Sequence, residues 1–360
     1  MNDQYRTLYG TIVLLLLGSV SSAARTDVLK TIVEDERYSI RQAASKKLEV
    51  YYPSPDDWRN ETIYQIITDR FDNGDPGNDQ AHPLGQFDPK KHNTLHGGDF
   101  RGIERRLDYL NELGVTALWI SPILLNSHGQ YHGYHTYDFG TIDPHWGTLR
   151  DLQRLIQKAH RRGIRMILDV ICNHTADLIK PQTSGRGRWK APPYAYQLAW
   201  RDETLKYLPP FDNLNWYHGH GGIDWNVPKS LVLGELYSLD DLKTELPAVR
   251  AHLTRAMKDL ITATDCDGFR VDTTRHVEPS FWIEWLPAIK EHAANLGKSN
   301  FIIFGESAEE DVEKLNKYLI DADGHVMYEA LIDFPERRVM ENVFAKNIAP
   351  PAELRTMHQE

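Results

Sequence analysis

Three short apolar segments of this 360-residue chain each end at or next to a carboxylate. The segments are IRMILDV, GFRVD and NFIIFGE, and their acidic residues are Asp169, Asp272 and Glu306. Short apolar runs bounded by turn-forming residues are typical of buried strands, and amphipathic helical segments that end at Gly lie between such runs here. Strands that alternate with helices predict a parallel sheet. Carboxylates at the C-terminal ends of its strands indicate a (β/α)8 TIM barrel with its functional site on that face.

Six strand–helix units of such a barrel are expected. The expected strands are 62–71, 115–122, 164–170, 267–272, 300–305 and 326–333. The expected helices are 107–114, 149–163, 245–263, 280–296, 309–320 and 336–347. A Pro-, Gly-, Trp- and Tyr-rich stretch after the third strand is too long for an ordinary loop. The expected division is a lead-in over 25–57, a first barrel part over 58–171, an inserted small domain over 172–243 and a second, incomplete barrel part over 244–360.

Residues 1–24 have the features of a secretory signal peptide. A polar start that contains Arg6 precedes the apolar run TIVLLLLGSV and then small residues suited to cleavage. The run is too short to cross a bilayer comfortably, so membrane contact is expected only if it stays uncleaved. A secreted, extracellular protein is therefore expected.

Charge and cysteine content exclude some functions. The formal net charge is −10 and the chain has no basic run, which argues against nucleic acid as a partner. Cys172 and Cys266 are expected at opposite ends of neighbouring parallel strands, farther apart than the roughly 7 Å between Cα atoms that a disulfide permits. Both are therefore expected to be free and buried.

Arg270 and Asp272 are expected on one face of their strand, because side chains alternate between the two faces. A guanidinium beside a carboxylate holds that carboxylate ionised, which suits a nucleophile. A structural ion pair at the end of the strand is the alternative.

The segments DVICNH, GFRVDTTRH and FGES resemble, in order and spacing, three signature regions of the α-amylase family of glycoside hydrolases. The resemblance runs from about Trp58 to the C-terminus. It implies a retaining mechanism with Asp272 as nucleophile and Glu306 as acid/base, which requires carboxyl groups about 5–5.5 Å apart. Glu306 also follows an apolar strand without a neighbouring cation in sequence, and such a setting raises a carboxyl pKa.

Two parts of the family pattern have no counterpart here. These are the fourth signature, an Asn/Ser-His-Asp after the seventh strand, and the β-sandwich domain that usually follows the barrel. The 360 residues by themselves are therefore expected to be inactive.

The same resemblance implies further substrate contacts. Tyr134, in YHGYHTYDF, would stack beneath the sugar, and His174 would bond its hydroxyls. Arg275 stands where the family usually has Lys, so contacts on the acceptor side are expected to differ. His132 and His135 flank Tyr134 and receive no role. The substrate-binding residues expected besides Tyr134 and His174 are Asp169, Arg270, Arg275 and His276.

Two calcium sites are expected, since Ca²⁺ takes oxygen ligands from carboxylates, amides and carbonyls. The resemblance implies one site between barrel and inserted domain, formed by Asn173, Asp241 and the backbone carbonyl of His276. The segments NGDPGND and GGD resemble the N-terminal calcium loop of cyclodextrin glucanotransferases and related amylases. The implied ligands are Asn73, Asp75, Asn78, Asp79, Gly97 and Asp99. A metal-free turn is the alternative, because Asp, Asn and Gly favour turns.

The expected function is α-amylase-type hydrolysis of an α-glucan. One alternative is a 4-α-glucanotransferase or cyclodextrin glucanotransferase, which differs only in whether water or a sugar hydroxyl resolves the intermediate. Another is the amylase-like domain of fungal α-1,3-glucan synthases, which have a lead-in similar to YPSPDDW. A non-catalytic amylase-like binding protein is the alternative of another class, and the presence of Asp272 and Glu306 argues against it.

Overall fold

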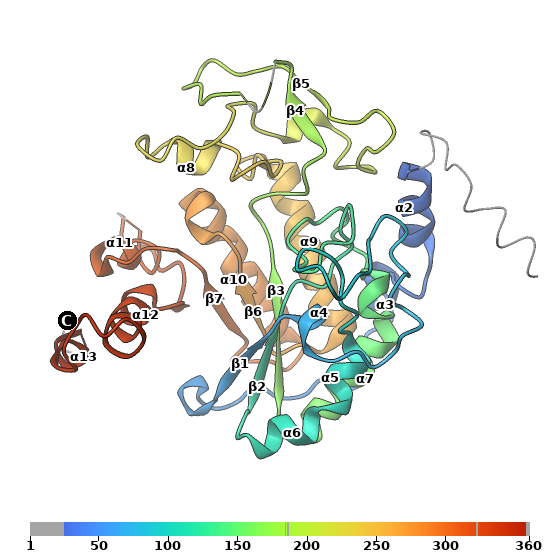
Figure 1. Cartoon of the computed structure of the whole chain (residues 1–360), viewed down its shortest axis with the longest axis vertical. Helices are drawn as coiled ribbons and strands as arrows, with labels where there is room; N and C mark the ends of the chain where they lie inside the picture. Colours follow the sequence, from blue (N-terminus) through green and yellow to red (C-terminus); the bar gives the residue numbers. More distant parts are fainter. Residues whose placement is uncertain (1–24, 184, 186, 322, 358–360) are drawn as a thin grey trace, which may run out of the picture.

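A sheet of six parallel strands occupies the centre of the described chain (Figure 1). The computed structural model describes residues 25–357 except 184, 186 and 322, so the expected signal peptide lies outside the described residues. The strand order β1-β2-β3-β6-β7-β8 follows the chain, as in a barrel that winds in one direction. The strands are β1 (Ile63–Ile66), β2 (Ala117–Ile120), β3 (Arg165–Val170), β6 (Gly268–Val271), β7 (Ile302–Gly305) and β8 (Ala330–Leu331). Each predicted strand contains one of them, which confirms the partial barrel.

Helices follow the strands at most of the predicted positions. The helix α7 begins with a capping box, in which Thr148 and Asp151 satisfy each other's backbone N–H groups. Its Leu152, Leu155 and Ile156 are buried in the core, as the amphipathic spacing predicts. The helices of the barrel are α5 (Phe100–Arg105), α6 (Leu107–Glu112), α7 (Leu149–His160), α9 (Pro247–Thr264), α10 (Pro279–Asn295), α11 (Val312–Asn316), α12 (Phe334–Met340) and α13 (Ala352–Met357).

Several predicted boundaries were wrong, among them those of the expected helix 309–320, of which only α11 is helical. The expected strand 62–71 ends at Ile66, and the following residues form the short helix α4 (Thr68–Phe71). There the buried Asp69 carboxylate accepts the backbone N–H groups of residues 96 and 97 and turns the chain away from the sheet. The expected strand 326–333 pairs over only two residues. The expected helix 336–347 is divided into two elements. The helix α12 ends at Met340, and the π-helix η5 (Glu341–Ala345) follows it.

Apolar side chains are exposed on the first strand of the sheet and shortly before its last strand. Ile63 and Tyr64 on β1 are 40% and 38% exposed, and Val326, shortly before β8, is 63% exposed. A closed barrel has no such edges, because its first and last strands pair with each other. The sheet of the described residues is therefore an open part of a barrel.

The inserted segment lies beyond the C-terminal end of β3, at the top of Figure 1. It holds a small antiparallel pair of strands. It contains the strands β4 (Ile179–Pro181) and β5 (Leu198–Trp200), the 3-10 helix η3 (Leu214–Trp216) and the helix α8 (Ser230–Leu233).

The lead-in over residues 25–57 packs against the inserted segment and against the barrel. It forms the helices α2 (Arg25–Glu34) and α3 (Ile40–Ala44). The backbone N–H of Thr26 donates to the carbonyl of Thr204 in the inserted segment at 3.2 Å, while α3 packs against α9.

The expectation for the two cysteines is confirmed, since both are buried and free. Among the helices that the structure describes, none has the length and apolar character needed to cross a membrane.

Candidate active site

The strand register brings three carboxylates together at one end of the sheet. Asp169 is the penultimate residue of β3, Asp272 follows the last residue of β6, and Glu306 follows the last residue of β7. The backbone N–H of Asp272 donates to the carbonyl of Val170 at 2.9 Å, and that of Glu306 donates to Val271 at 2.8 Å. Three neighbouring parallel strands thus end in acidic side chains on the face where barrels carry their active sites.

A single buried guanidinium joins these carboxylates. Arg270 Nη1 lies 2.8 Å from Asp169 Oδ1 and 2.9 Å from Asp272 Oδ1, and Nη2 lies 2.6 Å from Glu306 Oε2. Burial opposes the charge of Arg270, but the nearby carboxylates raise its pKa, so it remains cationic. The predicted pair of Arg270 and Asp272 is confirmed. The contact with Glu306 was not expected, because it depends on a neighbouring strand.

Asp169 is held from several sides. Its Oδ2 accepts hydrogen bonds from Tyr134 Oη at 2.9 Å and from Trp119 Nε1 at 3.0 Å. Burial raises the pKa of Asp169 to about 7, although Arg270 acts in the opposite direction. Asp169 thereby orients the ring of Tyr134 and the guanidinium of Arg270.

Glu306 has the properties of an acid. Burial raises the pKa of its carboxyl, the nearby charge of Asp272 raises it further, and Arg270 opposes both. The side chain is 27% exposed, whereas that of Asp272 is 8% exposed. Glu306 is therefore the more accessible of the two carboxyl groups, and it can exchange protons with solvent. The raised pKa was predicted from the apolar strand, and burial is its main cause.

A cavity of about 450 Å³ opens above these groups. Asp169 and Arg270 lie outside its lining and act through the residues they contact. The predicted residues that line it are Tyr134, His174, Asp272, Arg275, His276 and Glu306.

The histidines predicted at the substrate are neutral and anchored to the protein. His174 Nε2 donates to the carbonyl of Tyr134 at 3.3 Å, and His276 Nδ1 donates to the carbonyl of Leu231 in the inserted segment at 2.7 Å. Burial lowers their pKa values to about 3 and about 4. His276 therefore ties the barrel to the inserted segment as well as lining the cavity.

Sequence reasoning left out several residues that line the cavity. His132 accepts the backbone N–H of Tyr134 at its Nδ1, at 3.0 Å, so its Nε2 carries the proton. Burial lowers the pKa of His132 to about 4. Its place two residues before Tyr134 was the available signal. Trp225 and Tyr237 lie in the irregular inserted segment, where no periodicity marks them. The lining residues to which the sequence assigned no role include His132, His135, Trp225 and Tyr237.

Two of the residues expected at the cation site between the barrel and the inserted segment, Asn173 and Asp241, lie on adjacent stretches of backbone. The carbonyl of Asn173 accepts the N–H of Leu242, and His174 pairs with Asp241 in a short antiparallel bridge. Asp241 Oδ2 lies 2.7 Å from His218 Nδ1, and burial raises the pKa of Asp241 to about 7. A buried carboxylate with a raised pKa is the type of group that a cation would stabilise.

The second expected cation site contains buried oxygens that lack donors. Asn73 Oδ1 and Asn78 Oδ1 have no hydrogen-bond partner among the described residues. Gly97 has a φ of 91°, and a Cβ there would lie 2.4 Å from Asp79 Oδ1. Burial, and then the charges of neighbouring carboxylates, raise the pKa of Asp79. Asp79 Oδ1 accepts a hydrogen bond from Asn73 Nδ2 at 2.7 Å, whereas the buried amide oxygens of Asn73 and Asn78 without donors are the type of ligand that Ca²⁺ takes.

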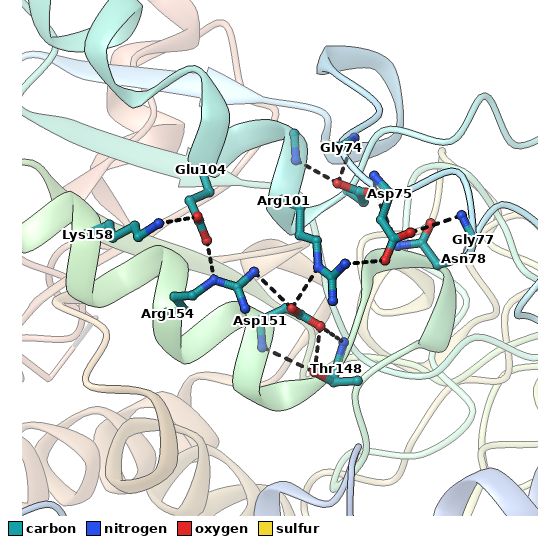
Figure 2. Close-up of polar contacts among 12 residues, drawn as sticks. Gly74, Asp75, Gly77, Asn78, Arg101, Glu104, Thr148, Asp151, Arg154 and Lys158 are labelled. Atoms are coloured by element: carbon teal, nitrogen blue, oxygen red, sulfur yellow. Dashed lines mark hydrogen bonds and ion pairs between the residues drawn. The ribbon is translucent and has the colours of Figure 1, made fainter.

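Two other expected ligands of this loop have protein partners. The carboxylate of Asp75 lies 2.7 Å from Arg101 Nη1 and accepts the N–H of Gly77, as Figure 2 shows. Asp99 accepts the N–H groups of residues 74, 75 and 102. Arg101 also forms an ion pair with Asp151 at the start of α7. This ion pair connects the loop to the barrel helices (Figure 2).

Among the described residues, Asp321, Asp323 and His325 form a group whose possible ligand atoms all lie within 4.8 Å of one another. It lies in a turn where these residues bond one another.

The family model described as alpha amylase, catalytic domain, matches residues 65–349. The chain belongs to the α-amylase family. It is 37% identical over 296 residues to a beta/alpha-amylase of Paenibacillus polymyxa, a match that covers 80% of this chain and 21% of that protein. It is 30% identical over 321 residues to a cyclomaltodextrin glucanotransferase of Klebsiella oxytoca, covering 85% of this chain and 46% of that protein. The chain thus spans less than half of these curated relatives.

Solved α-amylase-family structures have the same fold. The α-amylase from Geobacillus thermoleovorans, complexed with acarbose, matches with a TM-score of 0.61 and 33% identity. That match covers 80% of this chain and 54% of the solved one. A cyclomaltodextrin glucanotransferase with three domains matches with a TM-score of 0.65 and 30% identity, covering 79% and 58%.

Proposed function

We propose that the protein containing this chain is a secreted, retaining glycoside hydrolase that cleaves α-glucans in the manner of an α-amylase. The observation that carries the proposal is that Asp272 and Glu306 share one guanidinium at neighbouring strand ends and line one cavity. Glycoside hydrolysis with retention needs a nucleophilic carboxylate and a proton donor arranged together. The carboxyl separation of about 5–5.5 Å that this mechanism requires remains a prediction.

The proposed reaction has two steps. Asp272 attacks the anomeric carbon while Glu306 gives its proton to the leaving oxygen, so that a covalent glycosyl-enzyme forms and the leaving sugar departs. Glu306, now ionised, takes a proton from water, whose oxygen attacks the same carbon and releases Asp272. Arg270 Nη2, at 2.6 Å from Glu306, stabilises the carboxylate that the first step produces.

Transglycosylation is the second candidate. The relative from Klebsiella oxytoca is named a cyclomaltodextrin glucanotransferase, and its similarity to this chain is comparable to that of the hydrolases. In that reaction a sugar hydroxyl replaces water in the second step, while the two carboxyl groups keep their roles. A non-catalytic role receives no support from a cavity that contains both carboxyl groups.

The experiment uses the full-length protein, whether it ends at Glu360 or continues beyond it. Protein recovered from the culture medium is incubated with soluble starch, its N-terminus is determined, and the products are followed by NMR. We expect reducing ends that appear first as α-anomers, and an N-terminus near residue 25. Products that appear first as β-anomers would contradict retention, and cyclic products would favour the transferase. Protein found only inside the cell would contradict secretion.

We also propose that Ca²⁺ binds the loop with the donor-free oxygens of Asn73 and Asn78 and stabilises the fold. Asp79 and the Gly97 carbonyl would complete the ligands, and the ion would supply positive charge to buried oxygens. A cation that binds only the folded state stabilises it by about 2.7 kcal/mol at a concentration of 100 times its Kd.

Removing the metal is therefore expected to lower the melting temperature. A chelator should lower Tm, excess Ca²⁺ should restore it, and Asn73→Ala should reduce the Ca²⁺-dependent rise. The control is Asn60→Ala, which changes an exposed asparagine outside the loop and should keep the full rise. A Tm that does not respond to the chelator in the unmodified protein would contradict the proposal.

A further inference from the structure

Trp119 lies on β2 and takes no part in the lining of the active-site cavity. Its indole Nε1 donates to Asp169 Oδ2 at 3.0 Å, and the guanidinium of Arg270 lies over its ring, 5.1 Å from the centroid. We infer that Trp119 is a positioning residue, which holds Asp169 against Arg270 and thereby limits how strongly Arg270 acts on Glu306. This inference rests on the proposed function, because it concerns how Glu306 keeps the proton that the leaving sugar needs.

The strand register brings the indole to the acidic end of the sheet. Trp119 pairs with Ile167 on β3, so Asp169 lies two residues nearer the C-terminal end and on the same face of the sheet. Phe304 on β7 reaches the same indole across the intervening strands, with ring centroids 5.7 Å apart and an angle of 85° between the ring planes. Both rings belong to one apolar cluster inside the sheet. This packing fixes the orientation of the indole and therefore the direction of its N–H.

Arg270 is held by carboxylates at its terminal nitrogens and by aromatic rings over its face. Its Nη1 and Nη2 contact carboxylates, whereas its buried Nε has no hydrogen-bond partner among the described residues. The rings of Trp119 and Tyr134 lie 5.1 and 5.7 Å from the guanidinium carbon. An aromatic face within about 6 Å attracts a cation. Trp119 therefore contacts both members of the ion pair, with its N–H on Asp169 and its ring beside Arg270.

The hydrogen bond from Trp119 also affects the protonation of Asp169. Burial raises the pKa of Asp169 to about 7, and this hydrogen bond acts in the opposite direction. Without it, Asp169 would bind a proton more readily near neutral pH, and Arg270 would lose one of the anions it contacts. The charge of Arg270, which already lowers the pKa of Glu306, would then act on Glu306 more strongly. Glu306 would therefore lose its proton at a lower pH.

The other titratable groups near Glu306 have their own partners or a fixed charge. Asp272 raises the pKa of Glu306. His276 faces it from the 3-10 helix η4 (Thr274–His276), and burial keeps this histidine neutral. Arg275 pairs with a carboxylate that follows Glu306 in the chain. Among the described residues, Arg270 is the cation that forms an ion pair with Glu306, so an effect of the indole N–H reaches Glu306 through Arg270.

The test is the pH dependence of kcat/KM for maltoheptaose in the full-length protein, because the alkaline limb reports the proton on the general acid. Trp119→Phe removes the N–H and keeps an aromatic ring. It should shift the alkaline limb to lower pH by about half a unit. The loss of one hydrogen bond changes the pKa of a charged acceptor by roughly one unit, and Arg270 transmits a part of that change.

A second variant separates the N–H from the packing of the ring. The amino acid 3-benzothienylalanine, incorporated at position 119, keeps the shape of the indole and has sulfur in place of the N–H. It should give the same shift as Trp119→Phe without a packing defect. With an aryl α-maltotrioside that has an acidic phenol, both variants should shift the limb far less, because that leaving group needs little protonation.

The matched control is Trp58→Phe. Trp58 packs against the same apolar cluster, and its Nε1 donates to the carbonyl of Asn300 at 2.7 Å, at the opposite end of β7 from Glu306. This variant also loses an indole hydrogen bond, but it should keep the alkaline limb of the unmodified protein.

An alkaline limb for maltoheptaose that stays in place in both variants at position 119 would overturn the inference, and hydrolysis by the unmodified protein would leave the proposed function standing. An equal shift in Trp58→Phe would overturn the inference too, because the effect would then not depend on contact with Asp169. If the unmodified protein hydrolyses neither substrate, both the inference and the proposed function are overturned.

Discussion

Replacing Asp272 by Asn in the full-length protein is expected to lower starch turnover by about 10⁴-fold or more, the range found when a residue that reacts covalently is removed. The amide cannot attack the anomeric carbon, so no glycosyl-enzyme forms. Mass spectrometry after reaction with a slow 2-deoxy-2-fluoro glycoside should show one added sugar on the unmodified protein and none on the variant. A sugar adduct on Asp272→Asn would show that another residue is the nucleophile.

Glu306→Gln is expected to act differently, because its contribution depends on the leaving group. Loss of a general acid costs about 10²- to 10⁴-fold with natural substrates, whose leaving sugar needs the proton. An aryl glycoside with an acidic phenol needs little protonation, so its cleavage should be impaired far less. The control is Glu310→Gln, an exposed carboxylate nearby, which should leave both activities intact. Equal loss with natural and activated substrates would refute the acid/base assignment.

A polypeptide limited to residues 25–360 is expected to aggregate and to have essentially no activity on starch. In this segment Ile63 and Tyr64 on the edge strand β1 are exposed, and so is Val326 shortly before β8. Open apolar edges favour association with other chains, and a domain stable by about 5–15 kcal/mol has little to lose. The segment also contains no counterpart of the Asn/Ser-His-Asp signature that the family resemblance implies after a seventh strand.

The comparison is a longer form that continues through a strand followed by His-Asp, assayed beside the short form for reducing-sugar release. Within the short form, Tyr64→Lys should reduce aggregation without restoring activity, because charge on an edge strand opposes pairing. Comparable activity from both forms would show that Asp169, Asp272 and Glu306 on six strands are sufficient.

The amino-acid sequence alone determined the strand–helix alternation, the carboxylates at the strand ends and the pairing of Arg270 with Asp272. These features depend on local periodicity: apolar runs form buried strands, and side chains two residues apart on a strand share a face. The free cysteines followed from the same reasoning, since the two lie at opposite ends of neighbouring strands.

Only the tertiary structure decided what lies beside these local features. Arg270 reaches Asp169 and Glu306 because the parallel register aligns β3, β6 and β7, and a register between distant segments is not encoded in any one of them.

The cavity-lining residues that the sequence did not predict also depend on contacts between distant segments. Trp225 and Tyr237 belong to a segment whose path is set by contacts with the barrel, such as the bond from His276 to Leu231. The strands 62–71 and 326–333 were predicted too long, because an apolar pattern shows which residues suit a strand, whereas neighbouring strands and buried polar groups decide where pairing stops.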